Sequence, residues 1–184
     1  MSEIGPRQIL DFWFTETPQT RWFVADCAFD AAVRSRFEHV WREGRAGRLA
    51  DWENDKQGAL ALIVLFDQFP RNMFRGTAEA FSTDALARKI AERAIARGDD
   101  LEAPAFVRSF YYLPLMHSEA LVDQETCVRL TRERLGEGHY SYPYALSHKA
   151  VIERFGRFPA RSQAFGRGRT PEEAEFLNAN PAGF

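Results

Sequence analysis

Apolar residues recur at the three- and four-residue spacing of an α-helix in one segment after another, and the alternating pattern of strands is nearly absent. The first long example follows Asp26, a favourable N-cap residue, and stops at Gly44. Its apolar stripe consists of Phe29, Val33, Phe37, Val40 and Trp41. This patterning predicts an all-α fold.

The segment from Asp55 to Gln68 is apolar on every side in its middle, so we expect it to be the most buried helix. We expect it to end at Phe69, because Pro70 pushes the preceding residue out of helical geometry. Further helices are predicted from Ser82 or Thr83 to Gly98, from Pro104 to about His117 with a kink at Pro114, from 119 to 135, from Pro143 to Phe155, and from Thr170 onward.

A chain of 184 residues suits a single all-helical domain spanning 1–184. Short turns between helices of this length favour consecutive antiparallel pairs. With 45% hydrophobic and 14% aromatic residues, the core should be large and rich in rings. The aromatic surplus leaves room for a symmetric homodimer.

Charge and hydropathy exclude several classes of function. The formal net charge of −2 argues against a nucleic-acid-binding protein. The longest apolar run, 59–66, is too short to cross a membrane, and the first ten residues lack the pattern of an export signal, so we expect a cytoplasmic protein. Cys27 and Cys127 are the only cysteines and are expected to be reduced thiols in the core.

Two histidines are candidates for chemistry. Phe106, Phe110 and Leu113 mark the inward face of one helix, and His117 continues that face. His148 falls on the inward face of the last long helix. Each could be a core residue satisfied by a hydrogen bond or could line a pocket. Ser118 could cap the helix that follows His117, and Glu119 could orient an imidazole.

The stretch "LFDQFPRNMFRG" places Asp67 in the last turn of a helix, where the helix dipole disfavours a negative charge. We therefore expect a cation to meet it, with Arg71 and Arg75 the nearest candidates. The plain interpretation is a clamp between Asp67 and an arginine that ties the loop to the bundle.

The stretch "ERFGRFPARSQAFGRGR" crowds three arginines at the end of a helix, with only Glu153 close by to balance them, and two more arginines follow in a glycine-flanked loop. A solvated helix end is one interpretation, and a site for an anion is the other. The arginines are Arg154, Arg157, Arg161, Arg167 and Arg169.

Metal and cofactor motifs are not found in the sequence. The four histidines include no pair one helical turn apart, and neither cysteine lies near them, so we expect no metal site. No phosphate-binding glycine loop, nucleophile elbow or redox cysteine pair is present, and we expect no cofactor.

These stretches, together with "ILDFWF", "YYLPLMHSE", "HKAVIERFGRFPARS" and "TPEEAEFL", resemble a bacterial family known as domain of unknown function 924. The resemblance covers most of the chain and implies a fold similar to the tetratricopeptide-like superfamily, in which helix pairs stack into a superhelix. It implies no activity. The positions that match the family's motifs are Asp67, Gln68, Arg71, Asn72, Arg75, His117, Ser118, Glu119, His148, Glu153, Arg154 and Arg157. The chain departs from the family at Ala160 and Ser162, where relatives often carry histidine and asparagine.

Two hypotheses of function follow, beside a purely structural one in which the motifs only lock the helices together and function lies in other surface residues. The first is a binding module whose cleft, lined by arginine and histidine, takes an anionic small molecule or an acidic peptide. Its candidate ligand-binding residues are Arg71, Arg75, Arg154, Arg157 and Arg161. The second is a hydrolase- or lyase-like enzyme for a small anionic metabolite, with His117 or His148 moving protons and Glu119 or Asp67 orienting the imidazole. The absence of an activated nucleophile favours the binding module.

Overall fold

The computed structural model describes residues 4–180, and these residues form helices and turns without any strand. The predicted all-α fold is therefore confirmed, whereas its arrangement as a superhelix stays a prediction. The main helices are α1 (Pro6–Asp11), α2 (Cys27–Arg45), α3 (Lys56–Ile63), α4 (Phe69–Met73), α5 (Asp84–Arg97), α6 (Ala105–Met116), α7 (Leu121–Arg134), α8 (Ser141–Phe155) and α9 (Pro171–Ala179).

Short π-helical and 3₁₀ segments join or extend these helices. The π-helical segments are η1 (Phe12–Glu16) and η4 (Val64–Gln68). The 3₁₀ segments are η2 (Gln19–Arg21), η3 (Ala50–Asn54), η5 (Ala78–Phe81), η6 (Asp99–Glu102) and η7 (Pro159–Arg161). Among the helices of residues 4–180, none is long and apolar enough to cross a bilayer.

The chain divides into two compact units, which we describe separately. Unit 1 comprises residues 1–75 and 79–114, and unit 2 comprises residues 76–78 and 115–184. The boundary in the sequence falls inside α6, at Pro114. The prediction of one domain over 1–184 stays a prediction, and residues 1–3 and 181–184 lie outside the described part of the chain.

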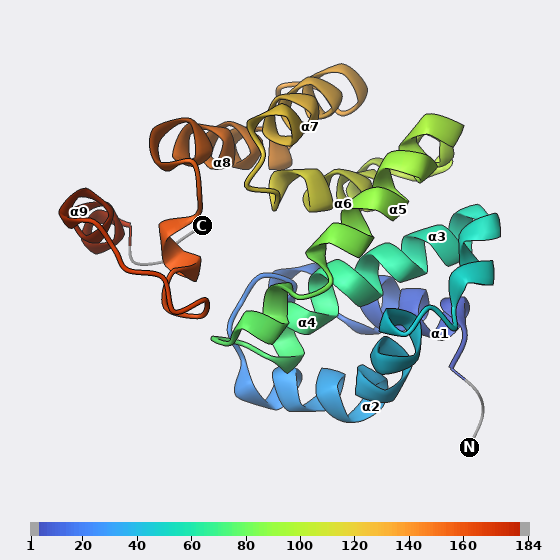
Figure 1. Ribbon diagram of the computed structural model, residues 1–184. Helices are drawn as coiled ribbons and strands as arrows, with labels where there is room; N and C mark the ends of the chain where they lie inside the picture. The colour runs from blue at the N-terminus through green and yellow to red at the C-terminus, as the bar shows by residue number, and fades with distance from the viewer. Residues whose placement is uncertain (1–3, 181–184) are drawn as a thin grey trace. The chain divides into compact units, whose positions relative to one another are not determined.

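Unit 1 is built around α3, which packs against α1 and α5, while α2 packs against α4 (Figure 1). Its core contains the fully buried rings of Trp13, Phe37, Phe69 and Phe110. The ring centroids of Phe37 and Phe69 are 4.6 Å apart. Because aromatic rings bury large apolar areas, this cluster contributes strongly to the stability of unit 1.

Helix boundaries predicted from capping residues agree well with the structure. The Asp26 side chain accepts hydrogen bonds from the first turn of α2, and Asp55 does the same for α3. Gly98 follows α5 in the left-handed conformation, with φ of 84°. Thr170 and Glu173 form a capping box at α9. Local side-chain chemistry thus sets these helix ends.

The prediction that the central helix ends at Phe69 is wrong. The helical path continues from α3 through η4 into α4 and passes Pro70. Proline lacks an N–H and crowds the carbonyl four residues earlier, here that of Phe66. In the wider η4 turn, the Phe69 N–H bonds the Val64 carbonyl instead.

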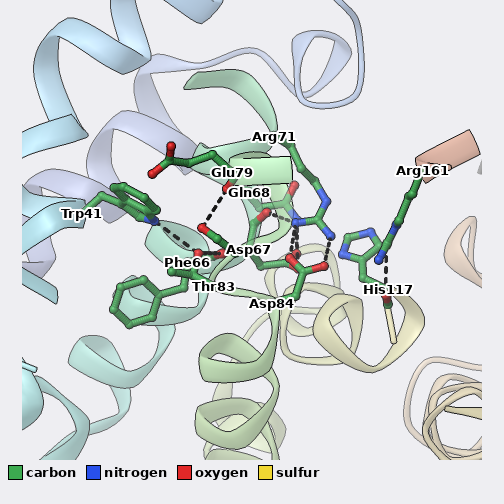
Figure 2. Close-up of polar contacts among 11 residues, drawn as sticks. Trp41, Phe66, Asp67, Gln68, Arg71, Glu79, Thr83, Asp84, His117 and Arg161 are labelled. Carbon is green, nitrogen blue, oxygen red and sulfur yellow. Dashed lines mark hydrogen bonds and ion pairs between the residues drawn. The ribbon is translucent and has the colours of Figure 1, made fainter. Parts of the chain in front are cut away.

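The carbonyl released by Pro70 has a partner at the N-cap of α5. The Thr83 hydroxyl donates to the Phe66 oxygen at 2.7 Å and accepts from Trp41 Nε1 at 3.2 Å (Figure 2). Thr83 occupies the N-cap position of α5, as expected, but its side chain does not cap that helix. A buried hydroxyl therefore satisfies two polar groups of the core.

Unit 2 contains the packed pair α7 and α8, with α9 against η7. Val151, Ile152 and Phe158 form its buried apolar cluster, and Phe155 and Phe176 pack against it. Helix α7 begins at Leu121, two residues later than expected, and α8 begins at Ser141, two residues earlier than expected. The prediction of two core thiols is half right, because Cys127 is buried but Cys27 is exposed.

Candidate functional site

Asp67 in η4 is fully buried, and the expected cation, Arg71, meets it. Arg71 Nη1 lies 3.3 Å from Asp67 Oδ1, and the Arg71 fork donates to both oxygens of Asp84 at 2.9 and 3.0 Å (Figure 2). Gln68 Nε2 also donates to Asp67, at 2.5 Å. The predicted clamp is confirmed, and it ties α4 to the first turn of α5.

The charge of Arg71 is held in place by its neighbours. Burial alone lowers the pKa of Arg71, but Asp67 and Asp84 outweigh burial and raise it. Arg71 is therefore a permanent cation between two carboxylates. Its donors already serve carboxylates of the protein itself, which argues for a structural role.

Arg75 is also paired with a carboxylate. Its Nε and Nη2 donate to Asp30 in the first turn of α2, at 2.7 and 2.8 Å. Asn72 donates to the same carboxylate at 2.8 Å. Burial raises the pKa of Asp30, but hydrogen bonds from Arg75 and Asn72 more than offset this, and the pKa is lowered. The sequence stretch that contains Asp67 is thus anchored to α2 and α5.

The interpretation that Glu153 is the only acid near the second arginine stretch is wrong. Arg154 pairs with Glu172 at 2.8 Å, and Glu153 itself pairs with Lys149 at 2.5 Å. Arg167 donates to both oxygens of Glu119, at 3.0 and 3.2 Å. Carboxylates distant in sequence therefore balance much of this basic stretch.

Arg157 fixes the N-terminus of α9. Its Nε and Nη2 donate to the two oxygens of Glu173 at 2.7 and 2.9 Å, and Nη2 also donates to the Gly168 carbonyl at 2.8 Å. The hydrogen bond from Arg157, aided by the Thr170 N–H, lowers the pKa of Glu173 to about 2. Glu173 is thus ionised throughout the neutral range.

Glu119 does not orient an imidazole, contrary to one expectation. Within the described residues its hydrogen-bond partners are Arg167 and the Phe158 N–H, the latter at 3.0 Å. Burial raises its pKa, but these hydrogen bonds outweigh burial and lower it. Ser118 accepts from the Ala120 N–H at 3.2 Å and donates to Asp123 at 2.5 Å, so it stabilises the start of α7 from outside the N-cap position.

His117 and His148 come together in unit 2, as their positions on two inward faces suggest. Both are half-buried, and their ring centroids lie 6.2 Å apart. The His148 ring meets the ring of Phe158 edge to face, with centroids 5.6 Å apart. An imidazole from the turn after α6 and one from α8 therefore share one small area of the unit.

A buried arginine lies next to this pair. Arg161 Nη2 donates to the His117 carbonyl at 2.9 Å (Figure 2), and its guanidinium carbon lies 4.5 Å from the Phe158 ring centroid. Only 9% of Arg161 is exposed. The neighbouring Ser162, at a position where the chain departs from the resemblance, is fully buried, and Ala160 is half-buried. We call His117, His148, Phe158 and Arg161 the imidazole cluster.

The tautomer of neutral His148 is set by a backbone group. Its Nδ1 lies 2.8 Å from the Tyr144 carbonyl oxygen, so Nδ1 carries the proton that is donated. In the neutral ring, Nε2 then has the lone pair, and protonation converts Nε2 into a donor. This arrangement suits either proton transfer or a charge-assisted bond to an anion.

The candidate residues are divided between the two units. Asp67, Arg71 and Arg75 belong to unit 1, whereas the imidazole cluster, Glu119, Arg154 and Arg157 belong to unit 2. Within residues 4–180, no group of three or more histidine, cysteine and acidic side chains is arranged to hold a metal. Burial raises the pKa of the Cys127 thiol to about 12, which leaves this thiol protonated.

Sequence reasoning missed the acids that bind the arginines. These acids are Asp30, Asp84, Glu172 and Glu173, together with Glu119 in its actual role. The sign of the dipole at Asp67 indicated a partner for that residue, but no local pattern indicates which distant acid meets each arginine. Glu173 had one detectable feature, the capping box with Thr170.

Comparisons with known proteins agree with the resemblance noted in the sequence. The model of the family described as bacterial protein of unknown function (DUF924) matches residues 9–181. A solved structure of a protein of unknown function from Agrobacterium tumefaciens is 38% identical, with a TM-score of 0.88, and the match covers 95% of this chain and 97% of the other. No curated protein matches. The chain therefore belongs to the DUF924 family of bacterial proteins of unknown function.

Proposed function

We propose that the protein is a binding module for a small anion or the carboxylate of an acidic peptide, and that the imidazole cluster of unit 2 is its site. The observation that carries the proposal is the convergence of His117 and His148, with ring centroids 6.2 Å apart. Each protonated imidazole offers charge-assisted N–H donors, which are strong ligands for phosphate and carboxylate.

The surroundings of the pair support an anion rather than a cation. Arg161 places a permanent positive charge beside the His117 carbonyl. Because Nδ1 of His148 is engaged with Tyr144, a bound anion meets Nε2, which must be protonated to donate. Anion binding at this site should therefore take up protons and strengthen at lower pH.

Of the five arginines predicted to bind a ligand, the proposal keeps one, Arg161. Arg71, Arg75, Arg154 and Arg157 each bind a carboxylate of the chain itself, so they hold the two units in shape. Arg161 is the one of these five arginines that contacts the imidazole cluster, through the His117 carbonyl and the Phe158 ring. The tetratricopeptide-like arrangement remains part of the proposal as the scaffold that would present such a site.

Calorimetric titration with inorganic phosphate, and then with a short acidic peptide, tests the proposal. Replacing His148 by Gln removes the cationic donor but keeps an amide of similar size, and we expect affinity to fall about ten-fold, the size of one charge-assisted bond. The matched control is His139→Gln in the same unit, whose ring bonds Ser141 and which should bind like the native chain. Equal affinities in both variants would place any anion site elsewhere.

A second candidate function, an enzyme acting on a small anionic metabolite, has one observation in its favour. The bond between His148 Nδ1 and the Tyr144 carbonyl leaves the lone pair of the neutral ring on Nε2, as a general base requires. The two functions differ in the pH at which His148 works. A base acts as neutral imidazole, so turnover would rise with pH, whereas anion binding would weaken. A screen of phosphorylated and carboxylated metabolites with native and His148→Gln protein separates them.

A further inference from the structure

Unit 1 contains a small pocket whose lining includes none of the candidate site residues. It lies where the end of α2, η3, the α3–η4 helix and α5 meet, and it has a volume of about 130 Å³. An apolar cavity of about 150 Å³ is large enough for a benzene molecule. The pocket is close to that size, which suits a group no larger than one ring or one short branched chain.

Its inner surface is apolar and already formed. Leu62, Phe66 and Ile90 form the buried floor, and the more exposed Leu49 and Leu86 form the walls. Gly44 completes the floor, since a Cβ there would approach Phe66 Cζ to 2.7 Å. The Phe66 ring thus lies directly against the backbone of α2, and little rearrangement is needed to accept an apolar group.

Positive charge predominates at the mouth. Glu53 and Arg93 line it as an ion pair, with Arg93 Nη2 donating to Glu53 Oε2 at 2.8 Å. Lys89 also lines the mouth, is exposed, and has no hydrogen-bond or ion-pair partner among the described residues. The other lysines are paired, Lys56 with Glu102 and Lys149 with Glu153. The mouth therefore has one positive charge without a counterion.

We infer that this pocket binds a small carboxylate whose apolar body is about the size of a benzene ring. The body would fill the floor, and the carboxylate would stay at the mouth beside Lys89. An apolar cavity with one convergent charge is a common form of small-molecule site. The site is independent of the imidazole cluster, which belongs to unit 2 and is lined by polar donors.

Three probes separate the two parts of this inference. Benzoate has the ring and the charge, benzyl alcohol has the ring alone, and acetate has the charge alone. In NMR titrations of methyl-labelled protein, benzoate should shift the methyl signals of Leu49, Leu86 and Ile90 with saturation in the millimolar range. Benzyl alcohol should bind more weakly, and acetate should leave these signals in place.

Variants at the mouth test the role of the charge. Lys89→Gln should weaken benzoate binding about two- to five-fold, as expected for a partly exposed ion pair, and leave benzyl alcohol unchanged. Lys56→Gln, which removes a paired lysine of the same unit, is the matched control and should bind benzoate like the native chain. If Lys89→Gln binds benzoate as tightly as Lys56→Gln does, the charge has no role and the inference is overturned.

A second variant tests the cavity itself. Leu86 is 39% exposed, so Leu86→Trp can fill the mouth without disturbing the core. It should abolish binding of both benzoate and benzyl alcohol while the melting temperature stays close to native. Persistent benzoate shifts at Leu49 and Ile90 in a folded Leu86→Trp protein would contradict a ligand inside the pocket.

Discussion

At the scale of single residues, several polar groups in the interior of unit 1 are tied to elements distant in sequence. Arg71 joins Asp67 to Asp84, and Thr83 joins Trp41 to the Phe66 carbonyl. Removing one member of such a group is costly because it leaves a buried donor, acceptor or charge without a partner. Substitutions that remove one partner should therefore be severe.

Arg71→Met should destabilise the protein by about 3–5 kcal/mol, because it leaves the buried Asp67 carboxylate without its cation. Urea unfolding followed by circular dichroism measures the loss. Arg34→Met, which breaks an exposed pair with Glu38, is the control and should cost less than about 1 kcal/mol. Adding Asp67→Asn to Arg71→Met should recover part of the stability. Failure to recover any would mean that the charge of Asp67 is not the source of the loss.

Thr83→Val should cost about 2–4 kcal/mol in the free energy of unfolding, because the Trp41 N–H and the Phe66 carbonyl both lose their partner. Thr83→Ser keeps the hydroxyl and should be milder. Ser82→Ala removes an exposed hydroxyl that donates to Glu79, and it should be nearly neutral. Equal stability of the Val and Ser variants would show that the hydroxyl of Thr83 is not needed.

At the scale of elements, two features set how the helices join. The π-helical η4 lets one helical path pass through Pro70, and Gly58 lets α3 approach η3 closely. A Cβ at Gly58 would meet the Trp52 carbonyl oxygen at 1.9 Å. Both features depend on contacts from other parts of unit 1, so the helix pattern alone does not predict them.

Gly58→Ala should destabilise the protein by about 1–3 kcal/mol, although alanine is the better helix former. The atom that the new Cβ would meet belongs to the backbone of η3, so this backbone has to move. A flexible side chain in the same place could have turned aside at little cost. Thermal and urea unfolding measure the effect. Gly138→Ala, at a position with open space and no positive φ, is the matched control and should be neutral. A stabilised Gly58→Ala protein would disprove the close approach.

The attachment of α9 should depend on pH through Glu173. Its folded pKa of about 2 lies below the ordinary value of 4.5, so its stabilising contribution is complete above about pH 4.5 and is lost as the pH falls towards 2. Unfolding measured across this range should show a smaller loss of stability in Glu173→Gln than in the native protein, because other carboxylates with lowered pKa remain. Glu172→Gln, at an exposed pair, should keep the native pH profile. Identical profiles for both variants would remove Glu173 as the cause.

At the scale of the whole molecule, features set by local sequence could be predicted, whereas features set by contacts between distant residues could not. Asp26, Gly98 and Thr170 set helix ends through their own backbone surroundings, and these ends could be predicted. The two inward histidines could be predicted because helical spacing fixes which face a residue occupies. The helical path through Pro70 could not be predicted, since the carbonyl that Pro70 leaves unbonded is satisfied by Thr83, which lies outside that path.

The arginine stretches show the same limit for the candidate site. Counting local charge left Arg75 and Arg157 in excess, whereas the fold brings Asp30 and Glu173 to them from 45 and 16 residues away. Such pairings depend on tertiary packing and have no local pattern. The proposed function rests on the imidazole cluster of unit 2, which brings two histidines together.

The most direct test of this function is an NMR pH titration of the four imidazoles with and without phosphate. We expect phosphate to move the titration midpoints of His117 and His148 upward together, because a bound anion favours the protonated ring, and to leave His39 and His139 unchanged. If the signals of both rings are half shifted at the same phosphate concentration, one shared site is supported. Unchanged midpoints for His117 and His148, or equal shifts of all four rings, would contradict it.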